Sequence, residues 1–141
     1  MWRMTIAGFL GFALAGCDMP RDPQLTTSLV RETETIRLGW VENAQADEHV
    51  SDALAKLQEK TGAGLQIHRG DSEKILAELA EGKIDLAYGT FAMQSPWSKE
   101  VYFGRAIGWR ARAPKHESVP RFAMRNGENG WIMTVEEAAR P

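Results

Sequence analysis

Hydrophobic positions along residues 36–88 follow two alternating periods. Short apolar or alternating runs predict strands, and apolar residues three or four positions apart predict helices with one buried face. The expected elements, in order, are a strand at 36–40, a helix opened by Asp47 and Glu48 and ended by Gly62, a strand at 65–68, a helix capped by Asp71 or Ser72 and ended by Gly82, and a strand at 84–88. Such alternation favours right-handed crossovers and a sheet buried by helices. The pattern predicts an α/β fold: a small three-layer domain with a mainly parallel sheet flanked by helices.

The pattern is less regular between residues 95 and 125. Ser95-Pro96-Trp97 interrupts the chain with a proline turn. Residues 101–112 are expected to form one strand or two, because Gly104 and Gly108 divide the segment. A further strand is expected at 121–125.

Two interpretations of the closing segment stay open. Residues 126–130 suit a hairpin turn, with a return strand at 131–135. Alternatively, the segment forms a helix whose apolar face is made of Trp131, Ile132, Val135 and Ala139. Thr134 and Glu137 also have the spacing of a capping box for a shorter helix. We favour a helix.

The first 17 residues, MWRMTIAGFLGFALAGC, have the pattern of an export signal. Arg3 precedes an apolar run that is too short to span a bilayer, which takes about 20 residues. The run ends in Leu14-Ala15-Gly16-Cys17, which resembles the lipobox of bacterial lipoproteins. The resemblance implies a signal peptide at 1–16, cleavage before Cys17 and acylation of its sulfur. An ordinary signal peptide, or an uncleaved anchor, with an incidental cysteine is the alternative.

The residues after the lipobox predict how the protein is held. In lipoproteins of enteric bacteria an aspartate after the cysteine tends to retain the protein at the inner membrane. The resemblance thus implies, through Asp18, a periplasm-facing location on that membrane. Residues 17–35 carry two prolines and no apolar period, so we expect a flexible, lipid-anchored tether. The alternative is that Leu25, Leu29 and Val30 belong to a short amphipathic helix packed on the domain at 36–141.

Composition excludes several classes of function. The 141 residues carry a formal net charge of −2, which gives no electrostatic reason to expect a nucleic acid. With one cysteine there is no internal disulfide, and no Cys/His cluster has the spacing of a metal site. No nucleophile, base and orienting group occur together, and Glu136 and Glu137 suit a solvated helix face. We therefore expect neither an enzyme nor a cofactor.

The order of the segments resembles a known family. IRLGW, DEHVSDALAKLQEKTG, LQIH, EKILAELAEGK and IDLAYGT follow one another at the intervals found in type II periplasmic solute-binding proteins. Gly82, Lys83, Asp85 and Leu86 match the family's G-K-x-D-L before the third strand. PWSKEVYFGRAIG is similar to the segment that leads into its V-x-F-S-x-P-Y strand. The resemblance covers residues 36–108 and, more weakly, 121–140, and implies a single solute-binding lobe.

Two departures from the family change what the resemblance implies. A full member has two lobes and is nearly twice as long, whereas the second lobe is missing here. Amino-acid-binding members carry an arginine that forks onto the ligand carboxylate, and Trp97 stands at that place. Arg105 either substitutes for this clamp or is a solvated surface residue. An amino-acid receptor of the usual type is therefore not expected.

The candidate site follows from the expected topology. In an open parallel sheet, ligands lie outside the carboxyl ends of the strands. Gly89 would allow close approach of the backbone, Thr90 offers polar groups, and aromatic rings could stack on a flat ligand. The alternative is that these aromatic rings belong to the core, and Asp85 is expected to be paired rather than catalytic. The ligand-binding residues predicted are Trp40, Asn43, Gly89, Thr90, Phe91 and Trp97.

Two functions from different classes remain. The first is a solute-binding component that hands a small molecule to an inner-membrane transporter. The second is a degenerate one-lobe interaction module that docks on a membrane complex, or on a second copy of itself, without binding a small molecule. Burying a small ligand normally takes a cleft with two walls. A single lobe would therefore need a homodimer or a partner protein as its second wall.

Overall fold

The computed structural model describes residues 22–109 and 112–141. The expected signal peptide, Cys17 and Asp18 lie outside these residues. The elements along the chain are α1 (Thr26–Thr33), β1 (Thr35–Val41), α2 (Glu48–Thr61), β2 (Gly64–Gly70), α3 (Ser72–Ala80), β3 (Leu86–Phe91), the 3-10 helix η1 (Pro96–Lys99), β4 (Val101–Ala106), β5 (Val119–Arg125) and α4 (Asn129–Ala138).

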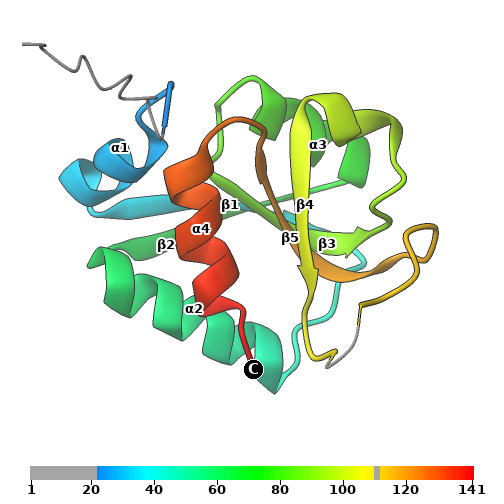
Figure 1. The fold of residues 1–141 in the computed structure, drawn as a ribbon. Coiled ribbons are helices and arrows are strands. Elements are labelled where there is room, and N and C mark those ends of the chain that lie inside the picture. Colours follow the sequence, from blue (N-terminus) through cyan, green and yellow to red (C-terminus); the bar gives the residue numbers. More distant parts are fainter. Residues whose placement is uncertain (1–21, 110–111) are drawn as a thin grey trace, which may run out of the picture.

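The strands form one sheet in the order β2-β1-β3-β5-β4 (Figure 1). Strands β2, β1 and β3 pair in parallel, and β5 pairs antiparallel with both β3 and β4. The α/β fold class is therefore confirmed. The sheet is mixed, because β5 runs back between two strands that share one direction.

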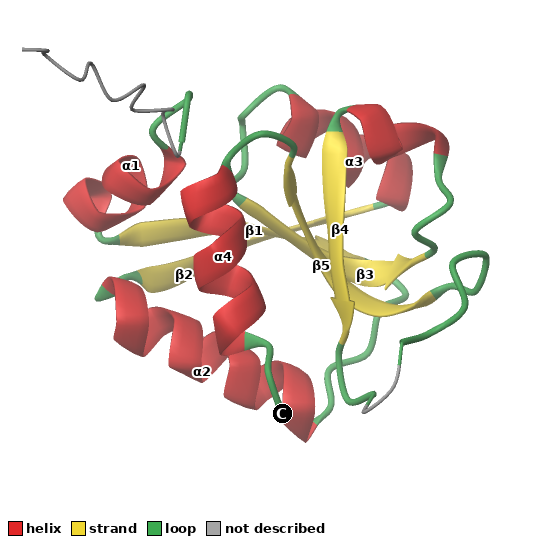
Figure 2. Cartoon of the chain, viewed as in Figure 1, coloured by secondary structure: helices red, strands yellow, loops and turns green. Residues whose placement is uncertain are grey.

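Helices cover both faces of the sheet, which gives the three layers (Figure 2). Helices α1, α2 and α4 share one apolar cluster with residues of the sheet. Helix α3 lies on the other face, in a second cluster that contains Phe91 and Phe103. The core is thus divided by the sheet into two parts of unequal size.

Short-range sequence signals set the helix ends. The Asp47 carboxylate accepts from the amide of Val50 at the start of α2, and Gly62 ends this helix with a φ of 69°. Asp71 caps α3 in the same way, through the amide of Lys74. These are the expected caps, since a side-chain oxygen satisfies an amide that the helix leaves free, and glycine adopts the left-handed cap at low cost.

The closing segment is a helix, as favoured, and the hairpin is wrong. Helix α4 begins at Asn129, before the capping box expected at Thr134, whose hydroxyl instead donates to the Gly130 carbonyl. Its first turn is capped from a distant part of the chain, by Asp22, whose Oδ1 accepts from the amide of Trp131 at 2.9 Å. Such a cap cannot be found from local spacing.

The segment expected to be a tether is partly ordered. Helix α1 packs on the domain through the buried side chains of Thr26 and Val30. A short packed helix is therefore observed, but of the three residues expected on its packed face only Val30 is buried, while Leu25 and Leu29 are exposed. The tether prediction missed two long-range carboxylate contacts. Asp22 caps α4, and the buried carboxylate of Glu128 accepts from the amides of Gln24, at 2.7 Å, and Thr26.

A buried carboxylate fixes the start of β3. Asp85 Oδ1 lies 2.7 Å from Arg37 Nη2, and Oδ2 accepts from the Arg37 amide at 2.9 Å. The Asp85 amide donates to the Arg37 carbonyl, and its own carbonyl accepts from the Trp131 indole at 2.8 Å. These bonds hold Asp85 directly before the strand, and β3 starts at Leu86 rather than at residue 84. As expected, Asp85 is paired.

We predict that Asp85→Asn lowers the free energy of unfolding by about 2 kcal/mol, because hydrogen bonds between charged groups are replaced by neutral ones. Chemical denaturation measures this change. The control is Glu81→Gln, which breaks only the exposed pair with Lys83 and should leave the midpoint unchanged. Equal midpoints for Asp85→Asn and the parent protein would show that the pair does not stabilise the fold.

We predict that Glu128→Gln loosens residues 22–33 without unfolding the sheet. Weaker acceptors for the amides of Gln24 and Thr26 should speed hydrogen exchange in this segment by about tenfold. Trypsin should also cut faster at the exposed Arg31. Glu137→Gln is the matched control, since Glu137 is an exposed residue of α4 that is paired with Lys60. An unchanged cleavage rate in Glu128→Gln would contradict the anchoring role.

Candidate functional site

The structure places two of the predicted aromatic residues in the core. Trp40 is 7% exposed, its ring lies 4.6 Å from that of Tyr88, and its indole nitrogen donates to the Ala44 carbonyl. Phe91 is buried on the opposite face of the sheet, with its ring 5.4 Å from that of Phe103. The two rings therefore do not share one groove.

The other predicted residues are also spread out. Trp97 is half-buried on η1 and donates its indole N–H to Glu73. A Cβ on Gly89 would lie 2.7 Å from the Phe91 ring and 2.8 Å from Val41, so packing alone requires this glycine. Thr90 and Asn43 are exposed. As ligand contacts the six residues stay a prediction, and none of them lines the cavity described next.

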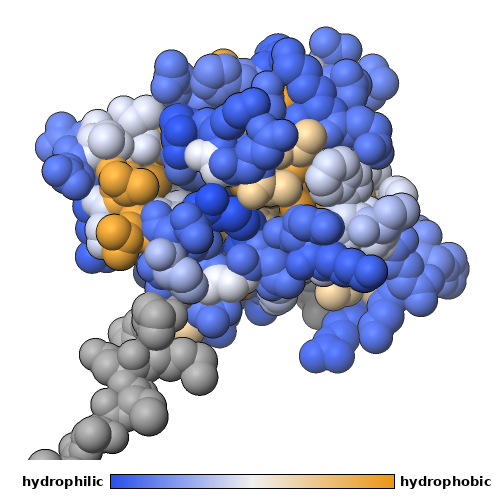
Figure 3. Space-filling view, turned by 90° about the horizontal axis from the view of Figure 1, so that it is seen from above, coloured by the Kyte–Doolittle hydropathy of each residue, from blue (hydrophilic) through white to orange (hydrophobic). Residues whose placement is uncertain are grey.

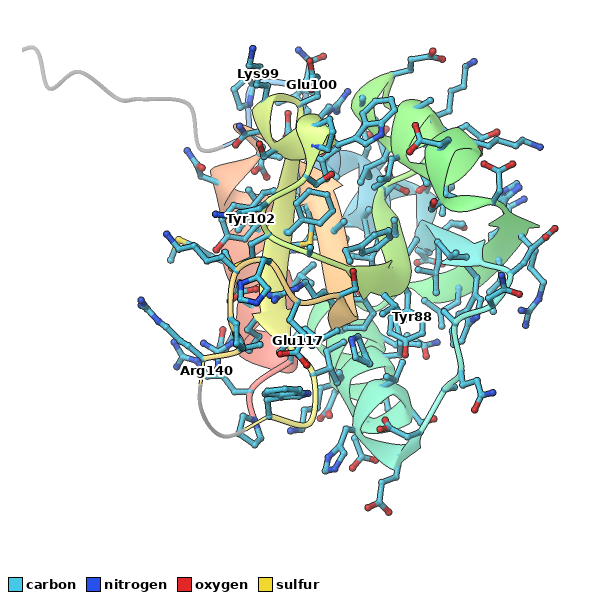
Figure 4. All side chains as sticks on the ribbon, turned by 90° about the vertical axis from the view of Figure 1, so that its right-hand side faces the viewer. Tyr88, Lys99, Glu100, Tyr102, Glu117 and Arg140 are labelled. Atoms are coloured by element: carbon cyan, nitrogen blue, oxygen red, sulfur yellow. The ribbon has the colours of Figure 1, made fainter. Side chains whose placement is uncertain are left out.

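A cavity of about 560 Å³ lies at the β4 edge of the sheet. Strand β4 forms one wall, α4 contributes one residue, and the connection from β4 to β5 provides the opposite side. Figure 4 faces this edge, with Tyr102 on β4 and Glu117 on the connection. The lining residues are Met93, Tyr102, Phe103, Gly104, Arg105, Ala106, Trp109, Arg112, Ala113, Lys115, Arg121 and Glu136.

A bulge in β4 shapes the wall of this cavity. Phe103 pairs with Ala123 and Ala106 pairs with Arg121, so two residues of β4 oppose one residue of β5. The bulge residues are Gly104 and Arg105. Extra residues of this kind bend an edge strand and change the direction of its groups.

Glu136 of α4 holds the bulge from outside. Its Oε1 accepts from the Arg105 amide at 2.8 Å, and its Oε2 lies 3.2 Å from Arg105 Nε. A Cβ on Gly104 would lie 2.5 Å from Glu136 Oε1, so only glycine leaves room for this contact. Arg105 is therefore a partly exposed residue with its own carboxylate partner, and Glu136 belongs to a structural contact.

Arg121 is the buried charge of the site. It is 2% exposed, and its Nε and Nη1 donate to the carbonyls of Phe91 and Gly104 at 2.9 and 2.8 Å. Its Nη2 is buried and has no hydrogen-bond partner among residues 22–109 and 112–141. An unsatisfied buried donor costs about 1–3 kcal/mol, and more when the group is charged.

Electrostatics at the cavity are positive, although the chain as a whole is negative. Burial lowers the pKa of Arg121 and the nearby Glu136 raises it, yet an arginine stays protonated at any physiological pH. Arg105, Arg112 and Lys115 add further positive charge, and the single acidic residue of the lining, Glu136, is already bonded to Arg105. The cavity can therefore attract an anion.

The same lining has an apolar part. Met93, Tyr102 and Trp109 are 37% to 41% exposed, and they are three of the seven exposed large hydrophobic residues described. Burial raises the pKa of the Tyr102 hydroxyl, with a smaller contribution from Glu136. Tyr102 is therefore a neutral hydrogen-bonding group at neutral pH.

Neither a metal-binding cluster nor a membrane-spanning helix is present among the described residues. Within the described ranges, no three His, Cys, Asp or Glu side chains are grouped so that they could ligate a metal ion. None of the helices in residues 22–109 and 112–141 combines the length and apolar character needed to cross a membrane.

Sequence reasoning missed Arg121, which stands first in the strand expected at 121–125 and is the third residue of β5 in the structure. RFAM places an arginine directly before three residues that are buried. A charged residue in such a run is a signal for a buried charge that needs partners. Which carbonyls it contacts depends on β3 and the β4 bulge, 30 and 17 residues away.

No protein-family model matches the chain, and no curated protein matches its sequence. Solved structures do match its fold. A mutant of domain 1 from TmArgBP, of T. maritima, in its arginine-bound form is similar over 81% of this chain and 95% of that one, with 14% identity and a TM-score of 0.64. The BvgS VFT2 domain of Bordetella pertussis (84% of this chain, 92% of that one, 9% identity, TM-score 0.59) is similar as well.

A third similar structure is an ancestral cationic amino acid solute-binding protein. It matches 81% of this chain and 92% of its own, with 11% identity and a TM-score of 0.61. Two of these neighbours, the arginine-bound TmArgBP domain and the ancestral solute-binding protein, are binding proteins by their own descriptions. The chain has the fold of a single lobe of a type II periplasmic solute-binding protein, as the sequence resemblance predicted.

Proposed function

We propose that the protein is a lipid-anchored, periplasm-facing solute-binding component that hands a small molecule to an inner-membrane transporter. The observation that carries this proposal is the 560 Å³ cavity at the β4 edge of a solute-binding lobe. Small-molecule sites are typically about 300–1,000 Å³ in volume, so the cavity has the right size.

The connection between β4 and β5 supplies the second wall that a single lobe was expected to lack. Its Lys115 carbonyl accepts from the Gln94 amide at 3.0 Å, which ties the connection to the loop after β3. Trp109, Ala113 and Lys115 then face β4 across the cavity. A solute can be enclosed between two parts of one chain, and a homodimer is not required for it.

The lipid anchor rests on Leu14-Ala15-Gly16-Cys17. Asp22 already belongs to the folded domain through its bonds to Trp131 and Thr27. The five-residue step from Cys17 to Asp22 spans at most about 17 Å. An acylated Cys17 would therefore hold the domain close to the membrane, near a transporter in the same bilayer, with Asp18 favouring the inner membrane.

One observation favours the alternative, an interaction module. Strand β2 is the edge of the sheet opposite to β4, and Ile67 on it is 48% exposed. An edge strand can pair with a strand of another chain, including a second copy. On the face drawn in Figure 3, however, apolar residues form small separate areas on a mostly hydrophilic surface. We therefore place solute binding first.

We predict that Cys17→Ala moves the protein from the membrane fraction to the soluble periplasmic fraction, because the acylated sulfur is lost. Fractionation followed by immunoblotting measures this, with metabolic labelling by a fatty acid as a second readout. Asp18→Asn is the matched control, which keeps acylation while altering the retention signal. A Cys17→Ala protein that stays unlabelled yet equally membrane-bound would contradict lipid anchoring.

We predict that one class of small solute stabilises the full chain in mild detergent. At 100 times its dissociation constant a ligand adds about 2.7 kcal/mol, which raises Tm by roughly 10 °C for a domain of this size. Thermal shift against amino acids, polyamines, neutral solutes, organic acids and inorganic oxyanions measures it.

The control variants for this screen lie on the β4–β5 connection. Ala113→Trp places a large ring at the cavity wall and should abolish the shift. Ser118→Trp adds the same ring at an exposed residue that does not line the cavity, and should keep it. A folded chain that no class stabilises would contradict solute binding and favour the interaction module.

A further inference from the structure

We propose that the β4-edge cavity binds an anionic amphiphile: a small organic acid whose carboxylate meets Arg121 and whose apolar body lies against Met93, Tyr102 and Trp109. This deepens the proposed function and rests on it, since it names the class of solute. The site is separate from the groove expected at Trp40 and Gly89, and it does not use the position of Trp97.

The first step is the unsatisfied guanidinium nitrogen Nη2 of Arg121. Two of its three nitrogens are bonded to the carbonyls of Phe91 and Gly104, so the side chain cannot turn away to find another acceptor. Nη2 has no partner among the described residues, and Arg121 forms no ion pair there. A buried cation in this state is best compensated by an anionic oxygen at Nη2.

The second step is the charge around Arg121. Arg112 and Lys115 lie in the same lining and have exposed side chains. Glu136 does not neutralise them, because both of its oxygens are bonded to Arg105. The excess of positive charge therefore favours an anion over a cation or a neutral solute.

The third step is the apolar part of the lining. Met93, Tyr102 and Trp109 come from three separate segments and gather at one cavity. An inorganic oxyanion would leave these surfaces in contact with water, whereas an organic acid buries them. Both N–H groups of Arg121 Nη2 lack a partner among the described residues, so this nitrogen can donate to a carboxylate.

Access to Nη2 requires a small movement of a lining side chain. The nitrogen is covered in the unliganded chain. The exposed side chains of Met93, Tyr102, Trp109 and Lys115 are the ones that can change rotamer without disturbing the core. Side-chain adjustment at a binding surface is common while the backbone stays in place.

The test uses the full chain in mild detergent and isothermal titration calorimetry with defined probes. Benzoate and octanoate carry a carboxylate on an aromatic and an aliphatic body. Benzamide is the neutral match of benzoate, benzylamine is its cationic match, and inorganic phosphate lacks the apolar body. We expect benzoate or octanoate to bind at least about tenfold more tightly than benzamide, benzylamine and phosphate.

Variants locate the site. Arg121→Met should weaken carboxylate binding by about 10- to 100-fold, as expected for one charge-assisted hydrogen bond. Because Arg121 also supports two carbonyls, this variant must be shown to fold by circular dichroism. Lys115→Gln and Trp109→Ala alter exposed residues and should each weaken binding by about two- to fivefold. Lys74→Gln, on an exposed face of α3, is the charge-matched control and should bind as the parent protein does.

Three results would overturn the proposal. If phosphate binds as tightly as benzoate, the apolar residues of the lining do not contribute to binding. Carboxylate binding that is unchanged in both Lys115→Gln and Trp109→Ala would place the ligand elsewhere. Stabilisation by polyamines, benzylamine or neutral solutes, without a response to carboxylates, would exclude the anionic class while leaving the proposed solute-binding function intact. Only a failure of every class of solute would remove both.

Discussion

The structure depends on how a buried carboxylate, Asp85, is satisfied. Its side chain is bonded to both the amide and the guanidinium of Arg37, and its backbone is bonded to Arg37 and to the indole of Trp131. A buried acid without such partners would be costly. The bonds to Arg37 fix the turn after α3 and the register of β3 beside β1. The bond to the Trp131 indole fixes the position of α4 against the same point.

The far edge of the sheet is organised by charge in a different way. Glu136 holds the β4 bulge through Arg105, and Arg121 reaches across from β5 to the end of β3 and to that bulge. Both carboxylate oxygens of Glu136 are bonded to Arg105, whereas Nη2 of Arg121 has no partner among the described residues. This asymmetry leaves a positive, partly apolar cavity at the β4 edge of the sheet. Trp109, Arg112, Ala113 and Lys115 of the β4–β5 connection line its other side, and Lys115 is bonded to Gln94 in the loop after β3.

Most of the fold could be predicted from the sequence, because its signals are local. The caps at Asp47 and Asp71, the glycine at residue 62 and the apolar spacing of α2 and α3 act within a few residues. The expected site was harder to predict. Trp40 and Phe91 follow adjacent strands but point to opposite faces of the sheet, and Gly89 is required by the Phe91 ring. The alternation of side chains along a strand tells which residues share a face of the sheet. It does not tell which helices cover that face.

The sequence by itself determined the α/β order, the starts of α2 and α3 and the resemblance to a solute-binding lobe, since periodicity and capping are properties of short segments. Only the tertiary structure decided that residues 22–33 pack on the domain, because this depends on Asp22 and Glu128 exchanging caps across about a hundred residues. It also decided that Arg121, the third residue of β5, becomes a buried cation whose Nη2 has no partner among the described residues. The physical reason is the same in both cases: the partners that satisfy a charge are chosen by the packing of distant segments.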